Sequence, residues 1–208
     1  MTTHKRLIKV CGMRHEANIR AVEALGIDMM GFIFWPGSSR CVSSPPAYLP
    51  ERCRRVGVFV DEDADRVRRI ADACALDCVQ LHGRETPDYC ARLSAYTVIK
   101  AFSIATAADL PQTDAYADVA SYFLFDTKGR SAGGNGTKFD WEVLQAYTGS
   151  TPFLLSGGIG PDDAAAVSAF SHPRCVGIDI NSRFELRPGL KDTAAIAAFI
   201  DRLAHASR

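Results

Sequence analysis

Residues 152–181, PFLLSGGIGPDDAAAVSAFSHPRCVGIDIN, contain one copy of the unit that decides the fold. The apolar runs 152–158 and 175–181 are short and nearly uninterrupted, as parallel strands are when both faces of the sheet are covered. A helix-like segment lies between the two runs. A strand, a helix and a second strand in this order are typical of a parallel sheet with helices packed against it.

The same unit recurs along the whole chain. Apolar runs predict eight strands, LIKVCG (7–12), MMGFIFW (29–35), RVGVFV (55–60), CVQLHG (78–83), TVIKAF (97–102), YFLFDT (122–127), PFLLSGG (152–158) and CVGIDIN (175–181). A helix-like segment is expected after each run, although Pro45, Pro46, Pro50 and Pro111 interrupt the second and fifth segments. Eight units predict an α/β fold, a (β/α)8 barrel that forms a single domain over residues 1–208. The alternative is an open doubly wound sheet, which usually has fewer strands and a glycine-rich first turn that this chain lacks.

Two helix boundaries can be predicted from capping residues. Gly26 is expected to end the helix after the first strand, because glycine readily adopts a left-handed backbone conformation. Asp61, Asp63 or Asp65 is expected near the N-terminus of the helix after 55–60, where a carboxylate can accept backbone N–H bonds.

The composition argues against several classes of protein. The chain has 24 basic and 24 acidic residues, so it lacks the basic excess typical of proteins that bind nucleic acid or a membrane surface. No apolar stretch approaches the roughly 18 residues of a membrane span. The N-terminal segment MTTHKRLIKV has no signal-peptide core. We therefore expect a cytoplasmic protein with no nucleic-acid or membrane partner.

The cysteines indicate neither a disulfide framework nor a metal site. The chain has seven of them, an odd number, and they form no C-x-x-C motif. Most are expected to be small buried residues in a reducing compartment, and no zinc site is predicted. Cys11 differs from the others because it directly follows an apolar run at the first predicted strand end.

Residues that can carry chemistry follow the predicted strands. The active site of a (β/α)8 barrel lies at the C-terminal ends of its strands. In chain order these ends carry Cys11, Arg40, Gln80, His82, Asp126, Gly157, Gly158, Asp179, Asn181, Ser182 and Arg183. We expect these residues to surround a common site for a small molecule.

The ends of the last two strands favour a phosphate site, because the loops after the seventh and eighth strands commonly bind phosphate in such barrels. Gly157 and Gly158 allow backbone N–H groups to approach an anion closely. Asn181 and Ser182 are expected to begin a short helix whose N-terminus faces the same anion. The alternative is that the two glycines form only a tight turn.

Cys11 and Asp126 are candidates for acid–base catalysis. They end strands on different sides of the barrel mouth, so both side chains can face a ligand between them. A thiolate can act as a base, and a carboxylic acid that is kept protonated can act as an acid. The alternative for Cys11 is a buried structural cysteine.

Other residues allow two interpretations each. His82 is a ligand or base, or else a hydrogen-bonded structural residue. Arg40 holds a carboxylate with its planar guanidinium, or else is a solvated loop residue. The glycine-rich loop 128–139 is expected to form a lid or side wall, the alternative being slack between two elements. Lys9 and Lys100 lie inside predicted strands and have no matching acid.

The sequence contains, in this order, the segments KVCGM, GFIFWPGSSR, VGVFV, VQLHG, FDT, GGNGTKFDW, LSGGI, GIDINSRFE and PGLKD. Taken together, these segments resemble the phosphoribosylanthranilate isomerase family of tryptophan biosynthesis. The resemblance extends from the first predicted strand to the last helix. It implies a (β/α)8 barrel that converts N-(5-phosphoribosyl)anthranilate to 1-(2-carboxyphenylamino)-1-deoxyribulose 5-phosphate. The reaction is an Amadori rearrangement, for which the resemblance implies no cofactor.

The resemblance also assigns roles to residues. It implies that Cys11 is the general base, that Asp126 is the general acid and that Arg40 holds the carboxylate of anthranilate. It places the phosphate at the glycines after the seventh strand and at Asn181 and Ser182. Further contacts with the substrate are expected from Asp179, His82, Gln80 and Arg183. A monomer or a homodimer is expected.

Two positions depart from the family pattern. Ser182-Arg183 stands where many members have Ser-Gly, so Arg183 either adds a phosphate contact or points outward. Asp162-Asp163 stands where many members have an asparagine early in the helix after the seventh strand. Two carboxylates should weaken the binding of an anion there.

Two other functions are alternatives to the isomerase. The first is a related sugar-phosphate barrel, such as an epimerase or indole-glycerol-phosphate synthase. Such enzymes usually need a set of metal-binding His and Asp residues or a catalytic Lys–Glu pair. The second is a catalytically silent barrel that binds a phosphate ligand or serves in an assembly.

Overall fold

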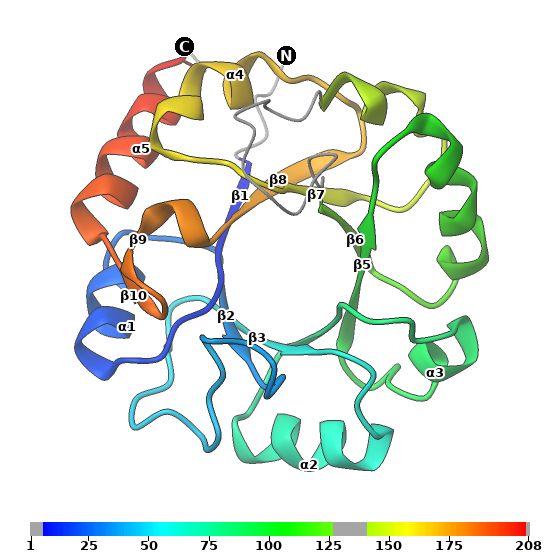
Figure 1. Ribbon diagram of the computed structural model, residues 1–208, viewed down its shortest axis with the longest axis horizontal. Helices are drawn as coiled ribbons and strands as arrows, with labels where there is room; N and C mark the ends of the chain where they lie inside the picture. Colours follow the sequence, from blue (N-terminus) through cyan, green and yellow to red (C-terminus); the bar gives the residue numbers. More distant parts are fainter. Residues whose placement is uncertain (1–5, 127–140, 207–208) are drawn as a thin grey trace.

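Eight parallel strands close into a barrel with helices on its outside, which confirms the fold predicted from the sequence (Figure 1). The computed structural model describes residues 6–126 and 141–206. The strands are β1 (Leu7–Val10), β2 (Met29–Ile33), β3 (Arg54–Phe59), β4 (Cys78–Leu81), β5 (Thr97–Ser103), β6 (Tyr122–Asp126), β7 (Phe153–Ser156) and β8 (Cys175–Ile180). Each strand pairs with the next and β8 pairs with β1, so the barrel has no free edge.

The helices differ more from the expectation than the strands do. The α-helices are α1 (Glu16–Glu23), α2 (Ala64–Ala73), α3 (Pro87–Ala91), α4 (Ala164–Ala169) and α5 (Thr193–Ala206). Short 3-10 helices span Ala107–Tyr116, Trp141–Ala146, Pro161–Asp163 and Ser182–Phe184, and β9 (Glu185–Arg187) pairs with β10 (Leu190–Lys191) in a hairpin. No helix in the described ranges is both long and apolar enough to cross a membrane.

The expectation of a helix after every strand is wrong for β2. Residues 34–53 form turns and irregular backbone, and Pro45, Pro46 and Pro50 lie within them. Proline lacks the N–H that a helix interior needs, and its ring clashes with the preceding turn. Pro111 has a milder effect, because it lies inside a 3-10 helix.

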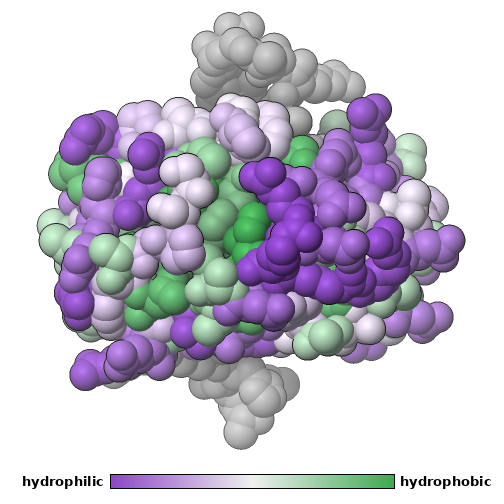
Figure 2. Space-filling model, turned by 90° about the horizontal axis from the view of Figure 1, so that it is seen from below, coloured by the Kyte–Doolittle hydropathy of each residue, from purple (hydrophilic) through white to green (hydrophobic). Residues whose placement is uncertain are grey.

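The missing helix leaves an apolar groove on the outside of the barrel. The groove has a volume of about 290 Å³ and lies between the turns after β2 and helix α2; its lining includes Phe34, Pro36, Val42, Pro45, Ile70 and Cys74. Figure 2 views the molecule from the side of α2 and shows apolar surface next to a strongly hydrophilic stretch. The prolines thus change the outer wall of the barrel but leave its closed sheet intact.

Both predicted helix boundaries are confirmed. The Asp63 carboxylate caps α2 by accepting hydrogen bonds from the backbone N–H groups of Asp65 and Arg66, at 3.1 and 3.0 Å. Gly26 follows α1 with a φ of +73°. Its N–H donates to the carbonyl of Glu23 at 3.0 Å, which satisfies one of the free carbonyls at the helix end.

The C-terminus of α2 contains a non-glycine residue in the left-handed region. Ala75 has a φ of +44°, and its N–H donates to the carbonyl of Asp72. The N–H of Leu76 donates to the carbonyl of Ala71, which completes a Schellman motif. We expect Ala75→Gly to raise the free energy of unfolding by about 1 kcal/mol, because glycine has no Cβ to oppose this conformation. In urea unfolding the midpoint should rise at an unchanged m-value, and a lower midpoint would contradict the prediction.

Alternation along the strands decides which side chains reach the barrel interior. Leu124 of β6 and Leu154 of β7 belong to a buried apolar cluster contributed by most of the strands. Asp126 and Ser156 come two positions later on the same strands, so they point to the same side. The interior therefore has apolar layers below and a polar layer at the C-terminal mouth.

The expectation that Lys9 and Lys100 have no matching acid is wrong. Lys9 Nζ lies 2.6 Å from Asp179 Oδ1 on the neighbouring β8. Lys100 Nζ lies 3.1 Å from Glu85 Oε2 and also donates to three backbone carbonyls. Burying an unpaired ammonium group is very costly, which explains why each buried lysine has a carboxylate partner.

Candidate active site

A cavity of about 430 Å³ at the C-terminal mouth of the barrel brings together the predicted site residues, with one exception. Its lining includes Cys11, Gln80, His82, Asp126, Gly157, Gly158, Asp179, Asn181, Ser182 and Arg183, but not Arg40. Ile33, Trp35, Val58 and Val60 also line it and form an apolar wall that the sequence analysis did not assign to the site. Their position at the ends of apolar strands is the signal that could have identified them.

Cys11 lies directly after β1 at the floor of this cavity. The residue is 3% exposed and packs in a small apolar cluster with Ile33 and Val58. Burial raises the pKa of its thiol, while the nearby ammonium groups of Lys9 and Lys191 act in the opposite direction. Ionisation of this thiol therefore depends on the cations around it.

Gly31 of β2 makes room for the Cys11 thiol. A Cβ at this position would lie 2.7 Å from Cys11 Sγ, which is too close, and 3.1 Å from its Cα, which is a tight contact. Glycine inside a strand often marks such a close approach, so the sequence carried a signal for this contact. We expect Gly31→Ala to displace the thiol, to lower kcat by a factor of about ten or more and to destabilise the fold by about 1–3 kcal/mol.

Gly57→Ala is the matched control for this prediction. A Cβ on Gly57 of β3 would lie 2.4 Å from Leu76 Cδ1, so this change also crowds a strand, but not against Cys11. Steady-state kinetics and urea unfolding should show lost stability in both variants and a specific loss of kcat in Gly31→Ala. Equal kcat in the two variants would contradict the assigned effect on the thiol.

Asp126 and His82 contact each other across the mouth. His82 Nε2 lies 3.4 Å from Asp126 Oδ2, and Gln80 Nε2 lies 3.2 Å from His82 Nδ1. With the Gln80 amide in this orientation its NH₂ group donates to Nδ1, and a neutral His82 then has its ring proton on Nε2, which faces the carboxylate. The hydrogen-bonded interpretation of His82 therefore fits the structure, although the ring also lines the cavity.

Gln80 presents an unused acceptor at the cavity. The residue is 1% exposed, and its Oε1 has no hydrogen-bond partner among the residues that the structure describes. A buried polar atom without a partner costs free energy. A hydroxyl or N–H group of a ligand in the cavity would satisfy it.

Asp179 lines the cavity, but both of its carboxylate oxygens have partners. Lys9 Nζ lies 2.6 Å from Oδ1, and Ser156 Oγ donates to Oδ2 at 3.2 Å. The three side chains come from β1, β7 and β8, which are neighbours in the barrel. Asp179 therefore links β1, β7 and β8 at the cavity. A ligand in the cavity can contact Asp179 next to these two hydrogen bonds.

The loops after β7 and β8 have a geometry suited to an anion. Gly157 and Gly158 have φ angles of +89° and +69°, which residues with a side chain rarely adopt. Asn181 precedes the 3-10 helix that begins at Ser182, as predicted. Because both loops line the same cavity, backbone N–H groups of the two loops can converge on one ligand.

The two departures from the family pattern lie beside these loops. Arg183 lines the cavity, and its Cδ would lie 3.2 Å from a Cβ on Gly160. It therefore adds positive charge to this end of the cavity. Asp163 accepts a hydrogen bond from the backbone N–H of Gly160 at 2.8 Å. This N–H group of the loop is therefore already bonded to a carboxylate of the protein.

Arg40 is held by an acid that the sequence analysis did not single out. Its Nε donates to both oxygens of Glu185 at 2.9 and 3.0 Å, and its Nη2 donates to Oε2 at 2.6 Å. Lys191 Nζ lies 2.7 Å from the same carboxylate. Although burial alone raises the pKa of Glu185, these contacts hold it below its usual range. The solvated-loop interpretation of Arg40 is thus wrong, because its Nε and Nη2 are bonded to a buried carboxylate.

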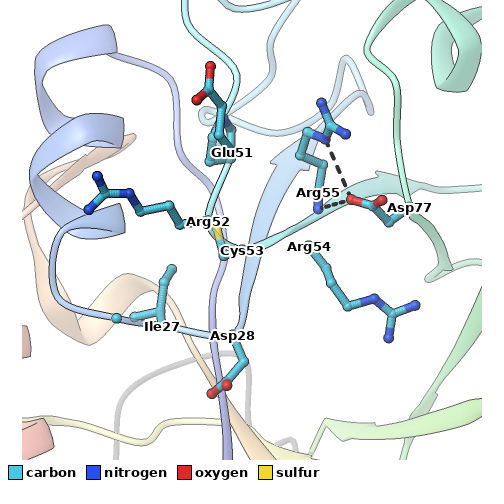
Figure 3. Close-up of a pocket in the computed structure, with 10 residues that line it drawn as sticks. Ile27, Asp28, Glu51, Arg52, Cys53, Arg54, Arg55 and Asp77 are labelled. Atoms are coloured by element: carbon cyan, nitrogen blue, oxygen red, sulfur yellow. Dashed lines mark hydrogen bonds and ion pairs between the residues drawn. The ribbon is translucent and has the colours of Figure 1, made fainter.

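A second cavity, of about 520 Å³, lies at the opposite end of the barrel (Figure 3). The guanidinium groups of Arg52, Arg54 and Arg55 point in different directions and do not converge on one point. Asp77 accepts hydrogen bonds from the backbone and the side chain of Arg55, at 2.7 and 3.5 Å. Asp28 accepts one from the backbone of β1 at 2.8 Å. These contacts fasten strand beginnings, so the cavity has a structural role.

Two further predictions concern the glycine-rich loop and a metal site. The glycine-rich loop 128–139, predicted to be a lid or side wall, lies outside the residues described by the structure. Within the described residues there is no cluster of three or more His, Cys, Asp or Glu side chains that could hold a metal ion.

Comparison with known sequences identifies one family. The family model described as N-(5'phosphoribosyl)anthranilate (PRA) isomerase matches residues 8–202. An N-(5'-phosphoribosyl)anthranilate isomerase from Phocaeicola vulgatus is 52% identical over 199 residues, covering 95% of this chain and 97% of that protein. The corresponding protein from Parabacteroides distasonis is 46% identical over 207 residues, covering 96% of this chain and 94% of that protein.

Solved structures agree with this result. The crystal structure of phosphoribosyl anthranilate isomerase from Thermus thermophilus superposes with a TM-score of 0.82 at 30% identity, over 96% of this chain and 98% of that chain. A phosphoribosyl anthranilate isomerase in complex with reduced 1-(o-carboxyphenylamino)-1-deoxyribulose 5-phosphate superposes with a TM-score of 0.81 at 28% identity, over 97% of this chain and 100% of that chain. Together with the match over residues 8–202, these similarities show that the chain belongs to the N-(5'-phosphoribosyl)anthranilate isomerase family, the isomerases of tryptophan biosynthesis.

Proposed function

We propose that this chain isomerises N-(5-phosphoribosyl)anthranilate to 1-(2-carboxyphenylamino)-1-deoxyribulose 5-phosphate, with Cys11 as general base and Asp126 as general acid. The observation that carries the proposal is that both side chains line one cavity. The same cavity contains the glycine loop after β7 and the start of the 3-10 helix after β8. A thiol, a carboxyl group and an anion-binding loop are the groups that this reaction requires.

The two sides of the cavity suit the two ends of the substrate. The phosphate binds to backbone N–H groups near Gly157, Gly158, Asn181 and Ser182, with Arg183 adding positive charge. The aromatic ring packs against the apolar wall formed by Ile33, Trp35, Val58 and Val60. A ligand of this kind is supported by the solved relative that is in complex with reduced 1-(o-carboxyphenylamino)-1-deoxyribulose 5-phosphate.

Arg40 keeps a narrower role than the sequence implied. Glu185 occupies its Nε and one edge of its Nη2, while Nη1 has no partner among the described residues. The guanidinium can still donate from Nη1 to the carboxylate of anthranilate, while Glu185 fixes its orientation. Arg40 thus binds the substrate from just outside the cavity lining.

Asp126 acts in the first step, in which the ribose ring opens. Asp126 donates a proton to the ring oxygen, the bond between C1′ and this oxygen breaks, and the lone pair of the anthranilate nitrogen forms a C=N⁺ bond. The resulting cation acidifies the proton on C2′. The substrate nitrogen is itself the electron sink, so the proposal needs no cofactor.

Cys11 acts in the second step, in which C2′ loses its proton. The thiolate takes this proton, the electron pair forms a C1′=C2′ bond, and the C=N⁺ bond returns to a neutral amine. The enolamine then becomes the ketone by losing the proton of the C2′ hydroxyl and gaining one at C1′. Two protons are taken up and two are released, so no oxidant or reductant enters.

Three further side chains support the substrate. Gln80 Oε1 accepts a hydrogen bond from a ribose hydroxyl, because it has no other partner among the described residues. His82 donates from Nε2 toward Asp126 and orients its carboxyl group. Asp179 contacts the sugar beside its ion pair with Lys9.

The wider setting is part of the same proposal. We propose that residues 1–208 form one catalytic domain and that it acts in the cytoplasm on a small-molecule substrate, without a nucleic-acid or membrane partner. The protein acts as a monomer or as a homodimer. A homodimer fits a solved relative from Thermotoga maritima that is described as dimeric.

The test is to supply N-(5-phosphoribosyl)anthranilate to the purified protein and to follow the loss of its fluorescence with a metal chelator present. We expect catalytic amounts of protein to consume the substrate. If the fluorescence does not change, the proposal is wrong. If turnover appears only after metal is restored, the protein is a metal-dependent sugar-phosphate enzyme instead. If the substrate binds but is not converted, the protein is a catalytically silent barrel that binds a phosphate ligand.

A further inference from the structure

Charged side chains form a buried cluster around Cys11. We call Lys9 of β1, Arg40 of the loop after β2, Asp179 of β8, and Glu185 and Lys191 of the β9–β10 hairpin the charge cluster. The side chains of both lysines are 0% exposed, and the two carboxylate side chains are 7% and 4% exposed. Such a concentration of buried charge is costly unless the charges balance one another.

One part of the charge cluster is a neutral pair. Lys9 Nζ lies 2.6 Å from Asp179 Oδ1, and Ser156 Oγ donates to Asp179 Oδ2 at 3.2 Å. Burial opposes the charged form of Lys9, yet the negative groups beside it raise its pKa, so it stays an ammonium. This pair adds no net charge to the surroundings of Cys11.

The other part of the charge cluster carries a surplus cation. The single carboxylate of Glu185 is shared by Arg40 Nη2 at 2.6 Å and Lys191 Nζ at 2.7 Å. Asn18 of α1 fixes the backbone of Lys191, which donates to Asn18 Oδ1 at 2.7 Å and accepts from its Nδ2 at 2.9 Å. The hairpin lies next to α1 (Figure 1). The ammonium itself is held by hydrogen bonds to Glu185 and to the backbone and side chain of Asn181.

The surplus charge lies close to Cys11. The N–H of Cys11 donates to the last carbonyl of β8 at 2.9 Å. The next residue, Asn181, accepts from Lys191 Nζ through its side chain at 2.7 Å. A Cβ on Gly12, the neighbour of Cys11, would lie 2.8 Å from Asn181 Oδ1 and 2.7 Å from Arg40 Cδ. Both cations bound to Glu185 are thus packed against the segment that carries the thiol.

We infer that Lys191 is a positioning residue whose ammonium balances the charge of the Cys11 thiolate. The charge cluster holds three cations and two carboxylates, so it becomes neutral only when Cys11 is ionised. Lys191 does not line the cavity and so touches no reacting atom. The inference rests on the proposed role of Cys11 as the base, because only a base needs its thiolate.

The effects on ionisation agree with this geometry. Burial raises the pKa of the Cys11 thiol, the charges of Lys9 and Lys191 lower it, and the charge of Asp179 raises it. Lys9 also lowers it through a hydrogen bond to the thiol, so the effects of Lys9 and Asp179 oppose each other while that of Lys191 adds to the cationic side. Burial likewise lowers the pKa of Lys191, against the effect of Glu185. Because burial disfavours both isolated charges, an adjacent thiolate and ammonium stabilise each other.

Other ionisable groups near Cys11 face it across the cavity. Asp126, His82 and Arg183 line the same cavity from β6, the end of β4 and the 3-10 helix after β8. Asp126 and His82 contact each other at 3.4 Å. The charged groups beneath the thiol are those of the charge cluster. The experiment therefore changes the residues of this cluster.

Four variants separate charge from packing. Lys191→Gln removes the surplus cation but keeps a side chain able to bond Asn181, and Lys191→Arg keeps the cation. Glu185→Gln removes a carboxylate, so it should act in the opposite direction to Lys191→Gln. Lys100→Gln is the matched control, because Lys100 is another buried lysine paired with an acid, but it does not line the cavity.

The experiment measures how fast iodoacetamide alkylates Cys11 at different pH values in each variant. Mass spectrometry of the peptide that contains Cys11 separates it from the six other cysteines. The thiolate is the reactive form, so the midpoint of this pH profile reports the thiol pKa without substrate.

We expect Lys191→Gln to raise the midpoint by about one pH unit or more, so that alkylation below it is about tenfold slower. Lys191→Arg should restore the parent midpoint, Glu185→Gln should lower it, and Lys100→Gln should leave it unchanged. Unchanged midpoints in both Lys191→Gln and Glu185→Gln, or an equal shift in Lys100→Gln, would overturn the inference. If Lys191→Gln does not fold, Glu185→Gln alone decides by the direction of its shift. High activity in Cys11→Ala would instead refute the proposed base and leave the measured titration standing.

Discussion

Cys11→Ala is expected to lower kcat by a factor of about 10²–10⁴ with little change in KM, because the substrate still binds but no group removes the C2′ proton. Alanine is a small apolar residue that can stay buried beside Ile33 and Val58. Thermal and urea unfolding should therefore show a stability close to that of the parent protein. Steady-state kinetics with N-(5-phosphoribosyl)anthranilate measures the loss.

Two variants sharpen this result. Cys11→Ser is expected to be nearly as slow as Cys11→Ala, because a serine hydroxyl has the size of the thiol but ionises far less readily. Cys74→Ala is the matched control, since Cys74 of the α2 C-terminus is also buried, at 1% exposed, but lies outside the cavity. Near-parent kcat in Cys11→Ala, or an equal loss in Cys74→Ala, would refute the role of Cys11.

The pH profile should carry the same signature. Burial raises the pKa of Cys11, so at neutral pH only a minor fraction of the free enzyme holds the thiolate. A base is active when deprotonated, so kcat/KM should rise with pH through the neutral range and level off above the thiol pKa. A profile that falls with pH across this range would contradict a thiolate base.

The barrel and the location of its site could be predicted because both follow from local pattern and a general rule. Apolar runs mark strands, and parallel strands in a closed barrel bring their C-terminal ends to one face. Residues as far apart in sequence as Cys11 and Asp126 are therefore expected at one mouth once the strands are assigned. The cavity that contains both confirms this expectation.

The ion pairs could not be predicted because they depend on which strand ends meet. Lys9 and Asp179 are 170 positions apart in sequence, and Arg40 and Glu185 are 145 positions apart. Only closure of the sheet, which puts β8 beside β1, makes the first pair visible. The pair of Arg40 and Glu185 also needs the hairpin after β8, which no apolar pattern in the sequence predicted. Long-range pairing of this kind is lost when a sequence is analysed one element at a time.

Asp126→Asn is the second variant for which a very large effect is expected. Asparagine has nearly the same shape and can still face His82, but it has no proton of suitable acidity for the ring oxygen. We expect kcat to fall by a factor of about 10²–10⁴ without loss of stability. Asp77→Asn is the control, because Asp77 lies at the opposite end of the barrel and its carboxylate bonds Arg55, away from the cavity at the mouth.

A substrate with deuterium at C2′ distinguishes the two catalytic roles. In Asp126→Asn ring opening becomes the slow step, and no bond to C2′ hydrogen breaks in it, so the isotope effect on kcat should be close to unity. In Cys11→Ser proton removal from C2′ becomes the slow step, so a large primary isotope effect is expected. The reverse pattern would mean that the two residues have exchanged roles. Large isotope effects in both variants would mean that loss of Asp126 also slows proton removal from C2′. That result is expected of a residue that orients the base and does not donate the first proton.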